Sequence, residues 1–325
     1  MTAAKDRLIV ILGPTAVGKT RLAVALARAL DTEIVSGDSM LVYRGFDIGA
    51  AKPDENERGG VRHALVDILE PEARFNVVDF QRLAAAEIRG LNARGMIPVL
   101  AGGTGLYVKA LLEGYRFNEE AEDSRFRARL EEIAAKRGKA YVHALLRRVD
   151  PDTAARLPEG DLRRVVRALE VRHLGRSTIS REKNEQGLVY DACVIGLSRS
   201  RENLYARIEA RVDEMMAAGL EAEVQGLLAR GVPPDAQAMQ GIGYKETAAF
   251  LMGHGTREDM VRDIKKATRR FAKRQLTWYR KMPYIRWFDA DAQDFGTLSE
   301  NVRREVVRFF GLGTDRRIDR DKRRV

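Results

Sequence analysis

The chain has 325 residues, of which 45% are hydrophobic and 32% charged, and its formal net charge is +10 with a pI of about 9.7. The apolar content excludes a disordered chain, the single cysteine excludes a disulfide scaffold or a cysteine zinc site, and no apolar run reaches membrane-spanning length. We therefore expect a cytoplasmic, monomeric protein without a membrane partner, and the positive charge leaves open whether nucleic acid is bound.

The first 115 residues alternate short apolar runs with amphipathic stretches. Residues 8–12 predict a strand buried on both faces, and residues 19–30 predict a helix with one apolar face. A strand at 33–36, a helix at 77–93, a strand at 97–101 and a helix ending near residue 112 are expected next. This order is typical of an α/β fold, a P-loop NTPase-like parallel sheet flanked by helices.

The composition changes near residue 114. From 116 to 187 there is no buried-strand pattern, and 17 basic residues stand against 13 acidic ones in segments of helical composition. The strand pattern returns at 191–197, so we expect a helical insertion at 116–187 in a discontinuous core of 1–115 and 188–311. Helices at 201–230, 244–252 and 257–281, a strand at 285–288, a helix at 298–310 and a basic tail at 312–325 complete the predicted order.

The strongest motif is Gly-Pro-Thr-Ala-Val-Gly-Lys-Thr at 13–20, which matches the phosphate-loop pattern at every fixed position. Its glycines let backbone N–H groups turn toward phosphate oxygens at the positive end of the following helix. Lys19 adds a charge, and Thr20 can offer its hydroxyl to Mg²⁺. The motif predicts a ligand that carries phosphate groups, and the strand before it and helix after it argue against a chance match.

Two further polar residues follow predicted strands. Asp38 comes just after the second strand, where it is either a metal organiser or general base, or else a helix N-cap. The strand at 97–101 ends in Gly102, Gly103 and Thr104 instead of the aspartate that usually holds Mg²⁺ in a phosphate-loop NTPase. Thr104 would face the site as a neutral hydrogen-bonding group or cap a helix.

The positive charge gathers after residue 256. Residues 257–286 contain 11 basic and 3 acidic residues, with an apolar face at helical spacing. The other faces carry the basic side chains Lys266, Arg269, Arg270, Lys273 and Arg274. Such a stripe suits a polynucleotide backbone, although it could also be a solvated face. The segment 238–246, with glycines on both sides of Ile242, is a weaker RNA-binding signal.

In combination, these segments resemble the tRNA dimethylallyltransferase (tRNA isopentenyltransferase) family of bacterial type. The resemblance spans residues 8 to about 290 and is carried by 13–20, 38–53, 102–107, 163–170, 239–246 and 268–280. Leu41 and Ala51 stand where many members have Gln and Thr. The zinc-finger extension of some eukaryotic members is missing.

The resemblance implies a reaction. The family transfers a dimethylallyl group from dimethylallyl diphosphate to N6 of the tRNA adenosine that follows the anticodon. Asp38 would take the N6 proton, Thr104 would orient the amine, and Lys19, Thr20 and Mg²⁺ would neutralise the leaving diphosphate. The expected diphosphate contacts are Gly13, Pro14, Thr15, Ala16, Val17, Gly18, Lys19 and Thr20, with Arg207 as a clamp.

The expected partners are dimethylallyl diphosphate and tRNA, whose anticodon stem-loop the insertion at 116–187 would bind. The extruded adenosine and its surroundings would contact Asp38, Ser39, Met40, Leu41, Thr104, Arg127, Arg163, Arg164, Val165, Val166, Arg167, Gln240, Gly241, Ile242, Gly243, Tyr244 and Lys245. Leu41 and Tyr43 would offer apolar and aromatic surface to the base.

Three other functions compete with this one. A small-molecule P-loop kinase would need the strand-end aspartate that is absent at 102–104. A transferase for free adenine nucleotides would need neither the insertion nor the basic helix. A non-catalytic RNA-binding protein would need neither the phosphate loop nor Asp38.

Overall fold

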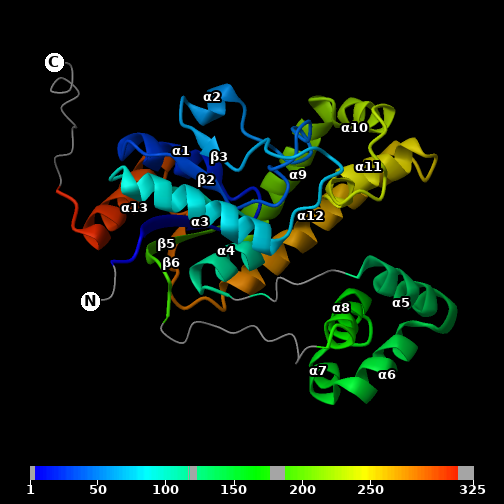
Figure 1. Ribbon diagram of the computed structural model, residues 1–325. Coiled ribbons are helices and arrows are strands. Elements are labelled where there is room, and N and C mark those ends of the chain that lie inside the picture. Colours follow the sequence, from blue (N-terminus) through cyan, green and yellow to red (C-terminus); the bar gives the residue numbers. More distant parts are fainter. Residues whose placement is uncertain (1–3, 116, 118–122, 176–186, 314–325) are drawn as a thin grey trace. The chain divides into compact units, whose positions relative to one another are not determined.

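The computed structural model describes residues 4–115, 117, 123–175 and 187–313. The chain divides into two compact units, one of residues 1–114 with 186–325 and one of residues 115–185, where the sequence predicted an insertion at 116–187. The first unit contains the sheet, and the described part of the second contains helices only (Figure 1). Of the expected basic tail, residues 314–325 lie outside the described residues.

Six parallel strands form one sheet in the order β3-β2-β4-β1-β5-β6, which confirms the predicted fold class. Their bounds are β1 Arg7–Leu12, β2 Ile34–Ser36, β3 His63–Ala64, β4 Val99–Ala101, β5 Asp191–Ser198 and β6 Arg286–Asp289. The sequence did not predict β3, because two residues without an apolar run give no strand signal. The chain leaves β1 toward β2 on one side and later adds β5 on the other, so the carboxyl end of β1 lies where such folds bind ligands.

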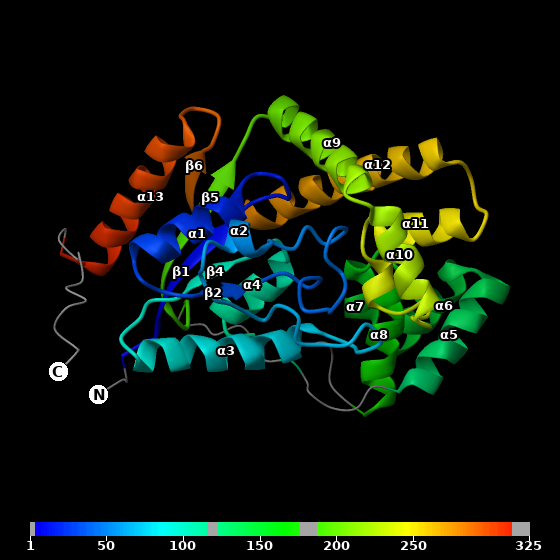
Figure 2. The same cartoon turned by 90° about the horizontal axis from the view of Figure 1, so that it is seen from above.

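Both faces of the sheet are covered. Along β1, Leu8, Val10 and Leu12 point into one apolar cluster, and Ile9 and Ile11 point into another. The first cluster contains residues of α3 (Val77–Ala93) and α4 (Gly105–Leu112), and the second contains residues of α1 (Lys19–Ala29) and α13 (Phe295–Phe310) (Figure 2). This burial on both faces explains the continuous apolar sequence of the strand.

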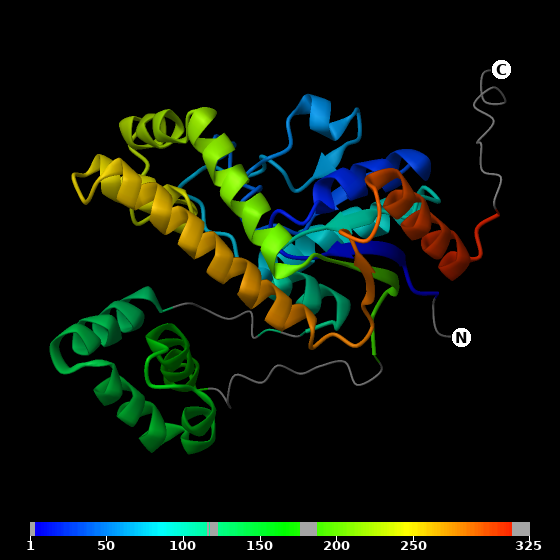
Figure 3. The same cartoon turned by 180° about the vertical axis from the view of Figure 1, so that it is seen from behind.

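The remaining helices of the first unit follow β5, apart from the short α2 (Glu55–Arg58). They are α9 (Arg201–Ala217), α10 (Leu220–Ala229), the 3₁₀ turn Ala238–Gln240, α11 (Tyr244–Leu251) and α12 (Arg257–Tyr279). The stretch 201–230 forms two helices because Gly219 adopts a φ of 98° between them. Helices α9 and α12 lie against each other, with ion pairs between Glu209 and Arg269 and between Asp213 and Lys265 (Figure 3).

The second unit has its own apolar core. Its helices are α5 (Ser124–Arg137), α6 (Lys139–Val149), α7 (Pro151–Arg156) and α8 (Leu162–His173). Leu130, Val142, Leu146, Val165 and Leu169 are among the buried residues that hold them together. A separate core is what allows these residues to be inserted into the α/β unit without disturbing its sheet.

None of the helices in the described part of the chain combines the length and the apolar character that crossing a membrane requires.

Candidate active site at the carboxyl end of the sheet

The phosphate loop, residues 13–20, connects the carboxyl end of β1 to α1. Gly13 adopts a φ of 153°, and a β-carbon there would lie 2.8 Å from the Leu197 carbonyl oxygen. Gly18 occupies the N-cap of α1 with a φ of 110°, and no side chain caps the helix. The N–H groups of the first turn are therefore available to an anion, as the motif predicted.

Lys19 turns back over the loop. Its Nζ donates to the carbonyl oxygen of Pro14 at 2.8 Å. Burial lowers the pKa of Lys19 to about 8, an effect that Asp38 opposes and Arg211 adds to. The loop thus holds a cation that lacks a direct anionic partner among the described residues, and a bound phosphate would supply one.

Three arginines around α9 donate to the phosphate loop. Arg199 Nε reaches the Val17 carbonyl at 3.3 Å, and Arg207 Nε reaches the Ala16 carbonyl at 2.8 Å. Arg211 Nη1 lies 3.4 Å from Thr15 Oγ1. The sequence had proposed Arg207 alone. Arg211 was missed, although its spacing of four from Arg207 puts both on one face of a helix.

Asp38 lies in the loop after β2. Its Oδ1 accepts the Met40 N–H at 2.8 Å, and its own N–H donates to Ser36 Oγ at 3.3 Å. No helix begins at Asp38, so the alternative role as a helix N-cap is wrong. The other oxygen, Oδ2, faces Gly103, where a β-carbon would lie 3.6 Å away. One carboxylate oxygen is held and the other points toward the end of β4.

Thr104 stands at the N-cap of α4 but makes no side-chain cap. Its Oγ1 instead accepts the Ser39 N–H at 3.1 Å and donates to Ser39 Oγ at 3.3 Å. The two loops approach closely because residue 102 is glycine. A β-carbon on Gly102 would lie 2.3 Å from the carbonyl oxygen of Gly37. Thr104 thus occupies the N-cap position that the sequence offered as an alternative but does not cap the helix through its hydroxyl, and Asp38 and Thr104 lie on adjoining loops.

Helix α12 supplies two buried groups whose contacts with the site the sequence did not predict. Gln275 accepts the Thr15 N–H on its Oε1 at 2.8 Å and donates from Nε2 to the Gly103 carbonyl at 2.8 Å. The Tyr279 hydroxyl donates to the same carbonyl at 2.8 Å. Burial, and then the charge of Asp38, raise the pKa of Tyr279, so the hydroxyl remains a donor. Only the tertiary packing of α12 reveals these contacts.

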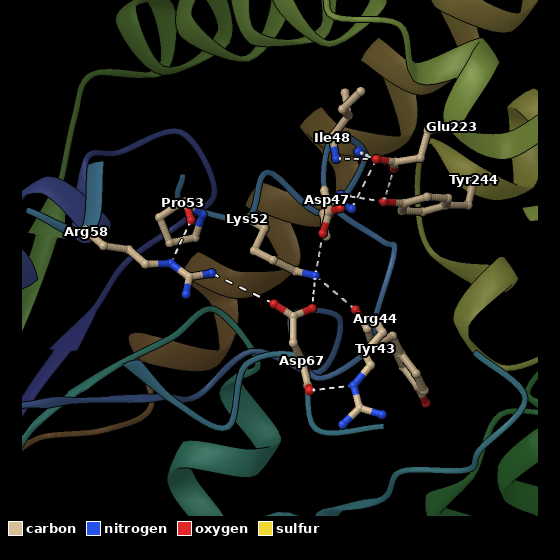
Figure 4. A network of polar contacts seen from close by, with 12 residues as sticks. Tyr43, Arg44, Asp47, Ile48, Lys52, Pro53, Arg58, Asp67, Glu223 and Tyr244 are labelled. Carbon is tan, nitrogen blue, oxygen red and sulfur yellow. Dashed lines mark hydrogen bonds and ion pairs between the residues drawn. The ribbon is translucent and has the colours of Figure 1, made fainter. Parts of the chain in front are cut away.

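The segment after Asp38 is anchored at residues 47–52 (Figure 4). The Glu223 carboxylate accepts the N–H groups of residues 47, 48 and 49 at 2.7 to 3.2 Å, and the Tyr244 hydroxyl at 2.7 Å. Lys52 Nζ, which is almost fully buried, donates to the Tyr43 carbonyl at 3.0 Å and pairs with Asp47 and Asp67. Glu223 and Tyr244 therefore fix this segment to α10 and α11, and Lys52 connects it to Tyr43 and Asp67.

The residues of the first unit that were predicted to contact RNA differ in their solvent exposure. Gln240 and Lys245 are exposed, Gly241 and Ile242 are half-buried, and Gly243 is buried. Tyr244 and Tyr43 are buried with no exposed surface, so their predicted contacts with RNA are wrong. A β-carbon on Gly241 would lie 2.6 Å from Met40 Cε, which places the 240–245 turn against the half-buried segment 39–41.

The residues of the second unit that were predicted to contact RNA are partly buried and partly held in ion pairs. Val165 and Val166 belong to its apolar core, so their side chains are not available to RNA. Arg127 and Arg167 both pair with the buried carboxylate of Glu170, at 2.8 and 2.6 Å. Arg164 pairs with Asp161, and Arg163 is exposed. Most of this arginine cluster therefore has a structural partner within the unit.

The exposed basic residues of α12 and its C-terminal end differ from the set that the sequence predicted. Arg269 pairs with Glu209 at 2.7 Å, so it belongs to the contact with α9. The exposed basic side chains without an ion-pair partner among the described residues are Lys266, Arg270, Lys273, Arg274, Arg280 and Lys281. Lys266, Arg270, Lys273 and Arg274 fall on one face of the helix, and Arg280 and Lys281 follow directly after its last residue; we call these six residues the α12 stripe.

The donor set around the phosphate loop fits Mg²⁺ together with a phosphate ligand. No group of three His, Cys, Asp or Glu side chains among the described residues could hold a metal. Mg²⁺ commonly takes one or two protein oxygens along with substrate phosphates and water. The exposed Thr20 hydroxyl, at the start of α1, is an oxygen of this kind.

The site combines a phosphate loop with a carboxylate on a neighbouring loop, and it has glycines where an NTPase has its metal-binding aspartate. It therefore belongs to a phosphate-loop protein unlike ordinary ATPases. The IPP transferase family model matches residues 41–282. The chain is 45% identical over 305 residues to a tRNA dimethylallyltransferase of Geobacillus thermodenitrificans, covering 93% of this chain and 96% of the relative. The chain belongs to the IPP transferase family, the tRNA dimethylallyltransferases.

Solved structures agree with this assignment. The full-length tRNA isopentenylpyrophosphate transferase of Bacillus halodurans is 41% identical with a TM-score of 0.72, covering 94% of this chain and 97% of that one. A eukaryotic dimethylallyltransferase acting on tRNA is 26% identical with a TM-score of 0.72, covering 93% of this chain and 78% of that one. The resemblance inferred from the sequence motifs is thereby confirmed.

Proposed function

We propose that the protein transfers the dimethylallyl group of dimethylallyl diphosphate to N6 of the adenosine that follows the anticodon of tRNA. One observation carries the proposal: the phosphate loop and the Asp38–Thr104 pair share one edge of the sheet, and Gln275 contacts both sides. A diphosphate and a nucleobase amine can thus be held side by side. Membership of the IPP transferase family supports the choice of donor and acceptor.

The donor side would stabilise the leaving diphosphate. Backbone N–H groups at the start of α1 and the Lys19 ammonium face the space into which the loop's ligand would fit. Arg207 and Arg211 reach the loop at Ala16 and Thr15, so two guanidinium groups are held beside the predicted phosphate site. Positive groups fixed before the reaction stabilise the charge that develops as the diphosphate departs.

The acceptor side would remove a proton. N6 forms a bond to C1 of the dimethylallyl group while the C1–O bond breaks and its electron pair leaves with the diphosphate. The N6 proton passes to Asp38, for which Oδ2 is the free oxygen because Oδ1 accepts the Met40 N–H. Thr104 would orient the amine, since its hydroxyl lies on the adjoining loop beside Ser39. The adenosine must leave its stack to reach this position.

Magnesium is part of the proposal. Thr20 would hold Mg²⁺ together with diphosphate oxygens, and the bound ion would supply further neutralisation of the leaving group.

The anticodon stem-loop is expected to contact the α12 stripe, Gln240 and Lys245, all of which are exposed.

The test compares the products of three reactions. The protein is incubated with dimethylallyl diphosphate, Mg²⁺ and either unmodified tRNA or free AMP, and digested products are analysed by mass spectrometry. A further reaction offers ATP and small-molecule phosphate acceptors. We expect N6-dimethylallyladenosine from tRNA alone. Product from AMP but not tRNA, ATP-dependent phosphate transfer, or tRNA binding without any product would each contradict the proposal.

A further inference from the structure

Gln275 uses both halves of its carboxamide in the interior. The side chain is 4% exposed, with Oε1 accepting from Thr15 N and Nε2 donating to Gly103 O, each at 2.8 Å. A backbone N–H can only donate and a carbonyl can only accept, so these two partners fix which way the amide points. A β-carbon on Gly103 would lie 2.6 Å from Nε2, so glycine is needed for this approach.

The two partners of Gln275 belong to different halves of the site. Thr15 is part of the phosphate loop, where the donor diphosphate would bind. Gly103 precedes Thr104, which holds the Ser39 N–H, and it faces the free carboxylate oxygen of Asp38. In the described part of the chain, the carboxamide of Gln275 is bonded to both the donor loop and the acceptor loop.

This arrangement links the two loops mechanically. The Thr15 N–H is a phosphate-loop donor, and Gln275 occupies it in this structure. A diphosphate that takes this N–H displaces Oε1, and because the carboxamide is planar and rigid, Nε2 shifts against Gly103 at the same time. The turn that carries Thr104 then changes its position or loses a hydrogen bond.

We propose that Gln275 is a positioning residue that couples the phosphate loop to the Gly103–Thr104 turn, so that diphosphate and tRNA change each other's affinity. The proposal rests on the proposed function, because it takes the two loops as the donor and acceptor sites. By thermodynamic linkage, the factor by which diphosphate changes tRNA affinity equals the factor by which tRNA changes diphosphate affinity.

Tyr279 provides a matched control. It lies one turn after Gln275 on α12, is fully buried and donates to the same Gly103 carbonyl at 2.8 Å. Among the described residues, its hydroxyl bonds to the Gly103 turn and not to the phosphate loop. Tyr279→Phe therefore removes a bond to Gly103 but keeps the connection to Thr15, whereas Gln275→Met removes both bonds with little change in volume.

The experiment measures the dissociation constant of unmodified tRNA with and without saturating inorganic diphosphate and Mg²⁺. For the unaltered protein we expect the two constants to differ by about fivefold or more. For Gln275→Met the ratio should fall to within about twofold of one, and for Tyr279→Phe it should stay near that of the unaltered protein. Gln275→Glu keeps an acceptor for Thr15 but lacks the donor to Gly103, so it should also lose the coupling.

Circular dichroism checks that each variant folds. If Gln275→Met does not fold, Gln275→Glu is used in its place to test the coupling. A ratio near one in the unaltered protein would overturn the proposal, as would coupling kept by the folded Gln275 variant or abolished equally in Tyr279→Phe. If the unaltered protein binds no tRNA or no diphosphate, the proposed function fails instead, so the two failures are distinguishable.

Discussion

Lys19 is a half-buried ammonium group close to Arg211. Its pKa falls to about 8 mainly through burial, from an ordinary value of 10.5. Between pH 8 and 10.5 the unfolded chain therefore binds more protons at Lys19 than the folded chain does. Below pH 8 the charged Lys19 destabilises the folded protein, and this destabilisation disappears as the pH rises from 8 to 10.5.

Diphosphate binding should consequently take up a proton at Lys19. Above pH 8 the free protein has a largely neutral Lys19, and a bound anion favours the ammonium form. Calorimetry with dimethylallyl diphosphate at about pH 8.5, in buffers of different ionisation enthalpy, should show net proton uptake. Lys19→Arg is the control, since a guanidinium stays charged and should bind with less uptake. Equal uptake by both proteins would contradict this account of Lys19.

The two faces of helix α12 carry different kinds of side chain. The inner face holds Gln275 and Tyr279, and the outer face carries the α12 stripe. Replacing Arg270 and Lys273 together with alanine should weaken tRNA binding and reduce its salt slope by roughly one for each phosphate that the protein no longer neutralises. Arg269→Ala is the matched control on the same helix, because Arg269 pairs with Glu209. A salt slope unchanged in the double variant would mean that the stripe does not contact RNA.

Helix α10 anchors the segment after Asp38 through Glu223. Glu223→Gln replaces one of two acceptor oxygens with a donor that faces backbone N–H groups, so we expect a loss of about 1–3 kcal/mol in the free energy of unfolding. Urea denaturation measures it. Glu221→Gln, on the same helix, breaks a more exposed ion pair with Arg257 and should cost about 0–1 kcal/mol. Equal losses in the two variants would show that Glu223 has no special anchoring role.

The sequence predicted the elements better than it predicted the faces they bury. The strands at 8–12 and 191–197 have continuous apolar sequences, and the phosphate loop is a local motif, so both could be found without tertiary information. Gln275 could not, because it acts through helix packing on a loop 260 residues away, and for Arg211 the only local signal was its spacing of four from Arg207. Tyr244 was misassigned because a glycine-flanked turn does not reveal whether its aromatic ring points inward.

At the scale of the whole molecule, chemistry and charge occupy different parts of the sequence. The catalytic candidates lie on loops at the carboxyl ends of β1, β2 and β4, whereas the α12 stripe lies near the end of the chain. The second unit has a core of its own, and several of its arginines are satisfied by Glu170 or Asp161. The net charge of +10 is therefore not a measure of RNA contacts, because part of the basic charge is used within the fold.

In the proposed reaction, Asp38 takes the N6 proton while the phosphate loop holds the leaving diphosphate. Single-turnover transfer to unmodified tRNA by Asp38→Asn, compared with the unaltered protein, tests it most directly. Asparagine keeps an oxygen for the Met40 N–H but removes the base. We predict a transfer rate lower by about 10²- to 10⁴-fold, with the dissociation constants of tRNA and diphosphate changed less than about threefold. A rate within a few-fold of the unaltered protein would contradict the account.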